Sequence, residues 1–273
     1  MEGAVRKMSR VVMIASYKGG VGKTTLSSGL AYVAARHENR VAALDMDLEF
    51  GGLDIALGEE NSAGASVADA LRGRCSWEAA LTPCAADGLF LMSSPMSLND
   101  SMADVTQEIV DALMWELKKS NDLVLLDMPA GGGPLFEKLA ACPWVDEVIL
   151  VSTDAPTALR TAEKCGMRLA QVSSKRVRLA INCYRVDRPE ENSAGILDIL
   201  DTVSVPVIGV IPFDAKVSGA LRQGRPITAM EGSPAAGAIE NIFLRLAERQ
   251  IPLLQGIVKK RKRNKLYRMN SKK

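Results

Sequence analysis

Short apolar runs alternate along the chain with longer segments in which apolar residues recur every three or four positions. The runs occupy residues 11–15, 41–44, 123–126, 178–181 and 207–211, and helical periodicity covers 26–35, 106–119, 158–172 and 234–248. Runs that are apolar throughout are typical of parallel strands buried on both faces. The alternation predicts one α/β domain, a doubly wound and mostly parallel sheet flanked by helices, with ligands bound beyond the carboxyl ends of the strands.

The segment between the first apolar run and the first helix has the pattern of a phosphate-binding loop. It reads Ser-Tyr-Lys-Gly-Gly-Val-Gly-Lys-Thr-Thr over residues 16–25. Its glycines allow consecutive backbone N–H groups to point at a polyphosphate near a helix N-terminus. We expect Lys23 to reach the terminal phosphates and Thr24 to bind Mg²⁺. The predicted nucleotide contacts within this loop are Gly19, Gly20, Val21, Gly22, Lys23, Thr24 and Thr25.

The loop departs from the strict G-x-x-x-x-G-K-[ST] pattern, because its first position is Tyr17. A loop without that glycine that reads K-G-G-V-G-K-T-T resembles the deviant Walker A box of the MinD/ParA superfamily, and of its MinD branch in particular. The resemblance implies that ATP and Mg²⁺ bind, that ATP is hydrolysed to ADP and phosphate, and that ATP builds a homodimer. It also implies that Lys18 contacts the ATP of the partner subunit and stabilises phosphoryl transfer. The alternative for Lys18 is a solvated loop lysine.

Two aspartate motifs support the resemblance independently. Asp45-Met46-Asp47 closes the run 41–44 and is similar to the D-x-D switch of the family, and Asp127-Met128-Pro129-Ala130-Gly131 closes the run 123–126 and resembles the D-x-P-A-G of the MinD branch. By the resemblance, Asp47 positions the attacking water, and the catalytic residues are Lys18, Lys23 and Asp47. The metal candidates are Thr24, Asp45 and Asp127. For each aspartate considered alone, the alternative interpretation is an ordinary turn residue or a helix cap.

The adenine pocket has a weaker signal. Asn182 follows the run 178–181, and Pro212-Phe213-Asp214 follows the run 207–211. In the family these positions hold the base, so the resemblance makes Asn182, Pro212 and Asp214 the candidates. An asparagine side chain both donates and accepts hydrogen bonds, as a purine edge requires. The alternative for Asn182 is an ordinary turn residue.

The number and spacing of the cysteines indicate the redox compartment of the protein and argue against some related protein families. The chain of 273 residues has five cysteines, an odd number, and none of them forms a C-x-x-C pair. We expect a reduced cytoplasmic protein without disulfides. The spacing argues against relatives that use cysteine pairs at a dimer axis to hold an iron–sulfur cluster, zinc or arsenite.

The charge is divided unevenly along the chain. Residues 259–273 contain nine Lys or Arg and no acid, which leaves 25 basic and 32 acidic residues, a formal −7, in residues 1–258. We therefore predict an ATPase domain over 1–250 and a basic, partly amphipathic tail over 251–273. In the MinD branch the corresponding segment docks on the inner membrane, which implies peripheral attachment to an anionic surface. Five consecutive basic residues interrupt the apolar face, and a solvated tail or nucleic-acid binding are the alternatives.

Several biological roles fit these motifs. The leading one is spatial regulation of cell division, in which septum-site placement depends on a membrane-bound ATP dimer and a protein activator. The segment 153–160 is the candidate docking region for that partner, although Asp154 and Ala155 replace the proline and glutamate usual in the family. A ParA-type partition ATPase that binds DNA, a flagellar-number or pilus-assembly regulator, and a phosphotransferase are the alternatives. The acidic body and the D-x-P-A-G motif disfavour DNA binding.

Overall fold

A single eight-stranded sheet forms the centre of the computed structural model, which describes residues 9–60, 64–96, 104–186 and 195–256. The strand order is β3-β4-β2-β5-β1-β6-β7-β8, and every neighbouring pair is parallel except β3 with β4. The strands are β1 (Arg10–Ser16), β2 (Val41–Asp45), β3 (Thr82–Pro83), β4 (Leu89–Met92), β5 (Leu123–Ala130), β6 (Glu147–Thr153), β7 (Arg176–Tyr184) and β8 (Val207–Pro212).

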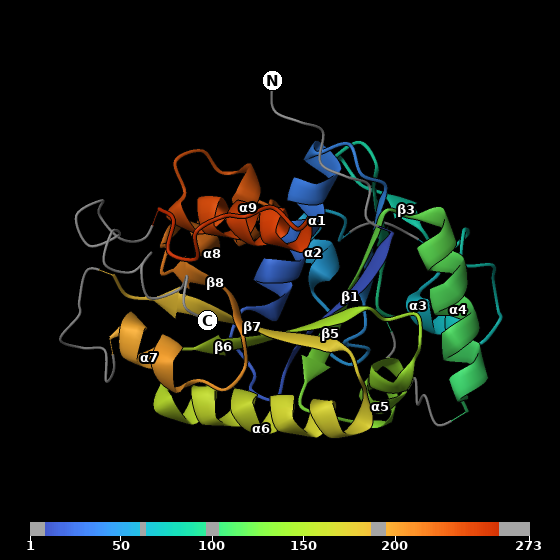
Figure 1. Cartoon of the computed structure of the whole chain (residues 1–273). Coiled ribbons are helices and arrows are strands. Elements are labelled where there is room, and N and C mark those ends of the chain that lie inside the picture. Colours follow the sequence, from blue (N-terminus) through green and yellow to red (C-terminus); the bar gives the residue numbers. More distant parts are fainter. Residues whose placement is uncertain (1–8, 61–63, 97–103, 187–194, 257–273) are drawn as a thin grey trace.

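Helices cover both faces of this sheet (Figure 1). They are α1 (Lys23–Arg36), α2 (Leu53–Leu57), α3 (Val67–Leu71), α4 (Gln107–Ser120), α5 (Pro134–Ala141), α6 (Pro156–Val172), α7 (Ile196–Thr202), α8 (Lys216–Arg222), the 3₁₀ turn η1 (Ile227–Ala229) and α9 (Pro234–Leu246). One apolar core packs α1, α2, α8 and α9 on one face, and a second packs α3 to α7 on the other. Alternate residues of β1 enter the two cores, because successive side chains of a strand point to opposite faces.

The sequence prediction of a doubly wound, mostly parallel sheet is confirmed. All five predicted strands and all four predicted helices are present. Several strands are longer than the apolar runs that predicted them and include polar residues at their ends. Asp45 ends β2, Asp127 lies inside β5, and β7 continues past Asn182 to Tyr184. Asp45 and Asp127 are therefore held in strands and not in free loops.

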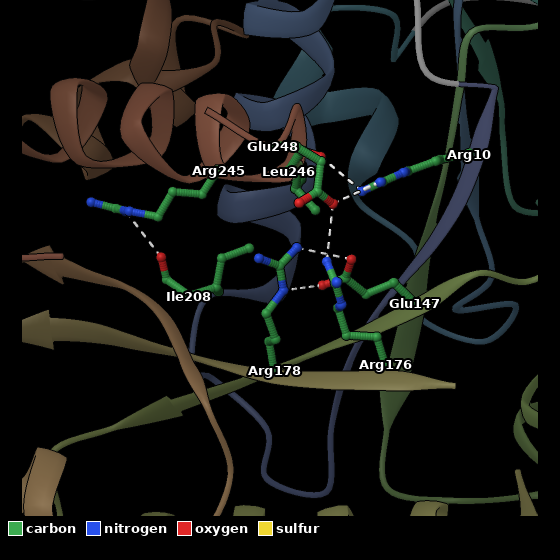
Figure 2. A network of polar contacts seen from close by, with 8 residues as sticks. All are labelled: Arg10, Glu147, Arg176, Arg178, Ile208, Arg245, Leu246 and Glu248. Carbon is green, nitrogen blue, oxygen red and sulfur yellow. Dashed lines mark hydrogen bonds and ion pairs between the residues drawn. The ribbon is translucent and has the colours of Figure 1, made fainter. Parts of the chain in front are cut away.

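A network of arginines and glutamates lies where β1, β6 and β7 begin (Figure 2). Glu147, the first residue of β6, has only 2% of its side chain exposed and receives two hydrogen bonds from the Arg178 guanidinium of β7. Glu248, beyond α9, accepts from Arg10 at 2.7 Å and from Arg176 at 3.0 Å. These pairs tie the ends of three strands to the segment after α9.

The Arg245 side chain of α9 binds the segment that follows this helix. Its guanidinium donates to the carbonyl of Ile208 in β8 (2.9 Å; Figure 2) and to the carbonyls of residues 251, 252 and 253. Burial, with a smaller contribution from the nearby Arg178 charge, lowers the pKa of Arg245 to about 10. Leu254 is buried against the core, so residues 251–256 pack on the domain. The domain boundary after residue 250 stays a prediction, and the basic block 259–273 lies outside the described residues.

Replacing Glu147 by alanine should cost about 3–5 kcal/mol of unfolding free energy, because Arg178 would remain buried without its partner. Urea denaturation at neutral pH measures this change. The matched control is Glu137→Ala, which removes the exposed Glu137–Arg168 pair and should change stability by at most about 1 kcal/mol. Equal effects of the two substitutions would contradict the assigned role of Glu147.

Candidate functional site

The phosphate loop leaves β1 and enters α1 through two left-handed glycines. Gly20 has φ +71° and Gly22 has φ +93°, conformations that side-chain-bearing residues rarely adopt. Gly22 is also the N-cap of α1 and supplies no capping side chain, so the first N–H groups of the helix keep their capacity to bind an anion. A Cβ at Gly22 would lie 2.2 Å from Nδ2 of Asn182. Glycine is therefore required there by both conformation and space.

Asp127 joins β5 to the start of α1. Its carboxylate accepts a hydrogen bond from the Thr24 hydroxyl at 2.7 Å and another from the Ser27 hydroxyl at 2.8 Å. The carboxylate is buried with 2% of the residue exposed. Burial raises its pKa to about 6, although the two hydroxyls and the Lys23 charge oppose that rise. Sequence analysis did not identify Ser27. Its position one turn after Thr24, on the same face of the helix, is the feature that could have indicated a contact with Asp127.

Asp45 lies beside Asp127 in the sheet, where the two residues are register partners of β2 and β5. Its carboxylate accepts the backbone N–H groups of Asp47 at 3.1 Å and Leu53 at 3.0 Å, and so shapes the loop that follows β2. Burial raises the pKa of Asp45 to about 7. The neighbouring carboxylates of Asp127 and Asp47 raise it further, against the two N–H bonds. A buried pair of acids with raised pKa values is typical of a cation-binding site.

The oxygen donors at this place fit Mg²⁺. The Thr24 hydroxyl and the carboxylates of Asp45 and Asp127 are hard ligands, and Mg²⁺ in nucleotide sites keeps several waters and phosphate oxygens besides a few protein ligands. Within the described ranges, no group of three or more His, Cys, Asp or Glu could hold a metal by itself.

Asp47 and Lys18 lie on the outer side of this site. Asp47 accepts a hydrogen bond from the backbone N–H of Phe50 at 3.2 Å, and Phe50 itself is 82% exposed. Lys18 is exposed, and its backbone N–H donates to the Ser16 hydroxyl at 3.1 Å. In the described part of the chain, no carboxylate pairs with Lys18.

A cavity of about 230 Å³ adjoins the phosphate loop at the ends of β7 and β8. It brings together all three adenine candidates of the sequence analysis with Gly20, Gly22 and Thr25 of the loop. The half-exposed ring of Phe213 also lines the cavity, and the Arg185 guanidinium stacks on that ring, 4.2 Å from its centroid. Sequence analysis had not assigned Phe213 or Cys183, another lining residue, because neither has a motif of its own.

Asn182 has a structural contact in addition to its predicted role. Its side-chain amide donates to the Val21 carbonyl at 2.8 Å, and its oxygen accepts the backbone N–H of Cys183 at 2.8 Å. One amide hydrogen and one lone pair remain for a ligand. Asn182 therefore links the end of β7 to the phosphate loop, and its contact with a base stays a prediction.

Asp214 shapes the loop after β8. Its carboxylate accepts hydrogen bonds from the Ser233 hydroxyl at 2.6 Å and from the backbone N–H groups of Lys216 and Ala235. Burial would raise the pKa of Asp214, but these hydrogen bonds and the Lys216 charge outweigh burial and lower it. The carboxylate joins the start of α8 to the start of α9, and its contribution to base binding stays a prediction.

The predicted partner region forms the end of β6 and the first turn of α6. α6 begins at Pro156, and Ala155 is its N-cap. Within the described ranges, no helix is both long and apolar enough to cross a bilayer.

Comparison with known proteins agrees with this geometry. Residues 12–227 match the family described as the CobQ/CobB/MinD/ParA nucleotide binding domain. The septum site-determining protein MinD of Synechocystis is 32% identical over 250 residues, which cover 90% of this chain and 92% of that protein. The MinD cell division protein of Aquifex aeolicus is 28% identical with a TM-score of 0.79, covering 89% of this chain and 99% of that structure, and its MinC:MinD complex matches equally well in TM-score and identity.

These matches confirm the sequence predictions of family, fold and enzyme class. The chain belongs to the CobQ/CobB/MinD/ParA nucleotide-binding family, as a P-loop ATPase whose sequence and fold are similar to those of MinD proteins.

Proposed function

We propose that this protein hydrolyses ATP in a cycle of dimer formation and release that places the cell-division septum. The observation that carries the proposal is the cluster beneath the phosphate loop, where Asp127 binds the Thr24 hydroxyl and lies in register with Asp45. The names of the similar proteins support the biological role, since the Synechocystis relative is a septum site-determining MinD.

In this proposal, different residues bind the phosphates, the metal ion, the attacking water and the adenine. Glycines 19, 20 and 22 and the first N–H groups of α1 bind the phosphates, and Lys23 neutralises their charge. Thr24, Asp45 and Asp127 hold Mg²⁺, which offsets the charge that develops during phosphoryl transfer. Asp47 orients the attacking water, and Lys18 contacts the ATP of the partner subunit. The cavity beside Asn182, Pro212 and Asp214 receives the adenine.

The exposed surface around Lys18 and Phe50 supports a face-to-face homodimer. Phe50 follows the Asp45–Asp47 segment and is 82% exposed, and Lys18 is exposed as well. A nucleotide held between two subunits would cover both residues. A protein partner binds near the first turn of α6 in this proposal. The MinC:MinD complex of Aquifex aeolicus supports a protein partner in general, and the surface that the partner contacts is our proposal.

We also propose a cytoplasmic protein that attaches peripherally to the inner membrane through the basic block 259–273. Each basic residue near an anionic leaflet contributes roughly 1 kcal/mol, so two tails on one dimer bind much more tightly than one. DNA binding is disfavoured by the net acidic charge of the rest of the chain.

The dimer is tested with Asp47→Ala, which should lower the hydrolysis rate about 10²-fold or more while leaving ATP bound. We expect this variant to elute as a dimer with Mg²⁺ and ATP and as a monomer with ADP, measured by light scattering after size exclusion. The double variant Asp47→Ala/Lys18→Ala should stay monomeric, and Asp54→Ala, on the neighbouring α2, should behave as wild type. A monomeric Asp47→Ala protein under saturating ATP would refute the proposed cycle.

The buried Asp45 should make the nucleotide-free protein less stable as pH rises. Its pKa is about 7 in the folded chain and ordinarily 3.8, so between pH 4 and 7 unfolding releases a proton and becomes easier. Asp45→Asn should remove a pH dependence on the order of a few kcal/mol across this window, measured by urea denaturation in EDTA.

Asp69 provides the control of opposite sign. The backbone N–H and hydroxyl of Ser66 lower its pKa, so its stabilisation is present above pH 4 and is lost as pH falls through the lowered pKa. Asp69→Asn should therefore leave the loss of stability between pH 4 and 7 in place. A wild-type curve that is flat over that window would contradict the assignment to Asp45.

Membrane attachment is tested by co-sedimentation with vesicles that contain anionic lipid, in ATP, in ADP and without nucleotide. A chain that ends at Gly256 keeps the packed residues 251–256 and removes only residues 257–273. We expect ATP-dependent binding of the full chain, a loss of about tenfold or more on truncation, and unchanged ATP affinity. Binding that persists in the truncated chain would contradict the role of the tail.

A further inference from the structure

Tyr17 occupies the position at which the strict phosphate-loop pattern has glycine, and it makes contacts that glycine could not make. Its ring meets Phe136 of α5 edge to face, with ring centroids 5.8 Å apart and an interplanar angle of 76°. Phe136 is buried, and Tyr17 packs against the same apolar core from the side of the loop. The first residue of the phosphate loop is therefore attached to a helix on the second face of the sheet.

The tyrosine also fits against the loop that follows the Asp127 motif. A Cβ added at Gly132 would lie 3.0 Å from the Tyr17 hydroxyl oxygen, so the two segments touch closely. The backbones of the two segments are also hydrogen bonded, because Gly131 donates its N–H to the Ser16 carbonyl at 2.9 Å. Tyr17 thus lies between the start of the phosphate loop, the Asp127 segment and α5.

Side chains of α5 and α6 influence the Tyr17 hydroxyl group. The pKa of Tyr17 is raised, mainly by burial and then by Cys165 of α6, while Arg168 of α6 lowers it and Glu137 of α5 raises it. Arg168 and Glu137 form an ion pair that joins the two helices. Tyr17 is therefore attached to α5 through Phe136 and lies near side chains of α6.

Lys18 follows directly and is exposed, with its backbone N–H bonded to the Ser16 hydroxyl. A glycine at position 17 would give the chain before Lys18 two unrestricted dihedrals, whereas the tyrosine ring restricts that position. We propose that Tyr17 is a positioning residue, which anchors the start of the phosphate loop to α5 and so orients Lys18 for its contact with the ATP of the partner subunit. This inference rests on the role of Lys18 in the proposed function.

The anchor should affect the dimer and the chemical step more than the binding of ATP. The nucleotide is held by the backbone of residues 19–25, whereas the ring of Tyr17 packs on α5 and beside Gly132. A preoriented cation stabilises the transition state because it needs no rearrangement at the moment of reaction. Loss of the ring should therefore lower kcat and weaken the dimer, with KM and the ATP dissociation constant nearly unchanged.

The experiment compares Tyr17→Gly, Tyr17→Phe, Phe136→Leu and the Tyr17→Gly/Phe136→Leu double variant in the full chain. The readouts are kcat, KM, the dimer dissociation constant in the Asp47→Ala background and the melting temperature. We expect Tyr17→Gly to lower kcat and weaken the dimer about three- to tenfold, the range that an aromatic pair supplies. Tyr17→Phe keeps the ring and should behave as wild type.

Phe136→Leu should show part of the same effect, and the double variant should be no worse than Tyr17→Gly alone, because both changes break one contact. Phe90→Leu, on β4 beneath Arg40, is the control for a lost phenyl ring elsewhere in the domain. A lower melting temperature with unchanged kcat and dimer affinity per folded molecule would overturn the inference. A wild-type chain that forms no dimer with ATP would instead overturn the proposed function, so the two failures are distinguishable.

Discussion

The hydrogen bonds from Thr24 and Ser27 to Asp127 are the contacts on which the site depends. They join residues about a hundred positions apart in the sequence and fix α1 over the carboxyl end of β5. The phosphate loop ends where α1 begins, so these two bonds help to fix the position of the loop relative to the sheet. The bond from Asn182 to Val21 and the packing of Tyr17 on Phe136 hold other parts of the same loop. Together these contacts give the N–H groups of the flexible glycines a fixed direction.

This arrangement places two acids in a buried position that is unfavourable without a cation. Asp45 and Asp127 are register partners, and burial raises both pKa values. Their few hydrogen bonds only partly offset the loss of water. The Asp127 carboxylate raises the pKa of Asp45 further, and the Asp47 carboxylate raises that of Asp127. Such a pair favours binding of a divalent ion with a polyphosphate, because the ion relieves the repulsion that the fold maintains. The stability lost in the free protein is thus recovered when the ligand binds.

The sequence was sufficient to predict the fold, and the site residues that it proposed lie together at the carboxyl ends of the strands, but it could not predict their contacts. Apolar runs located β1, β2 and β5, whereas β4 was missed because Leu89–Met92 is short and has no motif beside it. The ends of β2, β5 and β7 extended beyond the apolar runs, since Asp45, Asp127 and Asn182 are polar residues held by neighbouring strands. The bond from Asn182 to Val21 and that from Ser233 to Asp214 join distant segments, so no local pattern could predict them.

The two ends of the sheet have opposite energetic roles. At the amino ends, Glu147 with Arg178 and Glu248 with Arg10 join strands to the segment after α9, and charges are paired there. At the carboxyl ends, like charges are buried together, and Cys183 beside Asn182 has a left-handed φ of +57°, a conformation that costs energy for a residue with a side chain. Both ends belong to the same strands. The neighbouring buried acids and the strained backbone therefore lie together at the carboxyl ends, where a nucleotide and its cation can use them, while the amino ends carry paired charges.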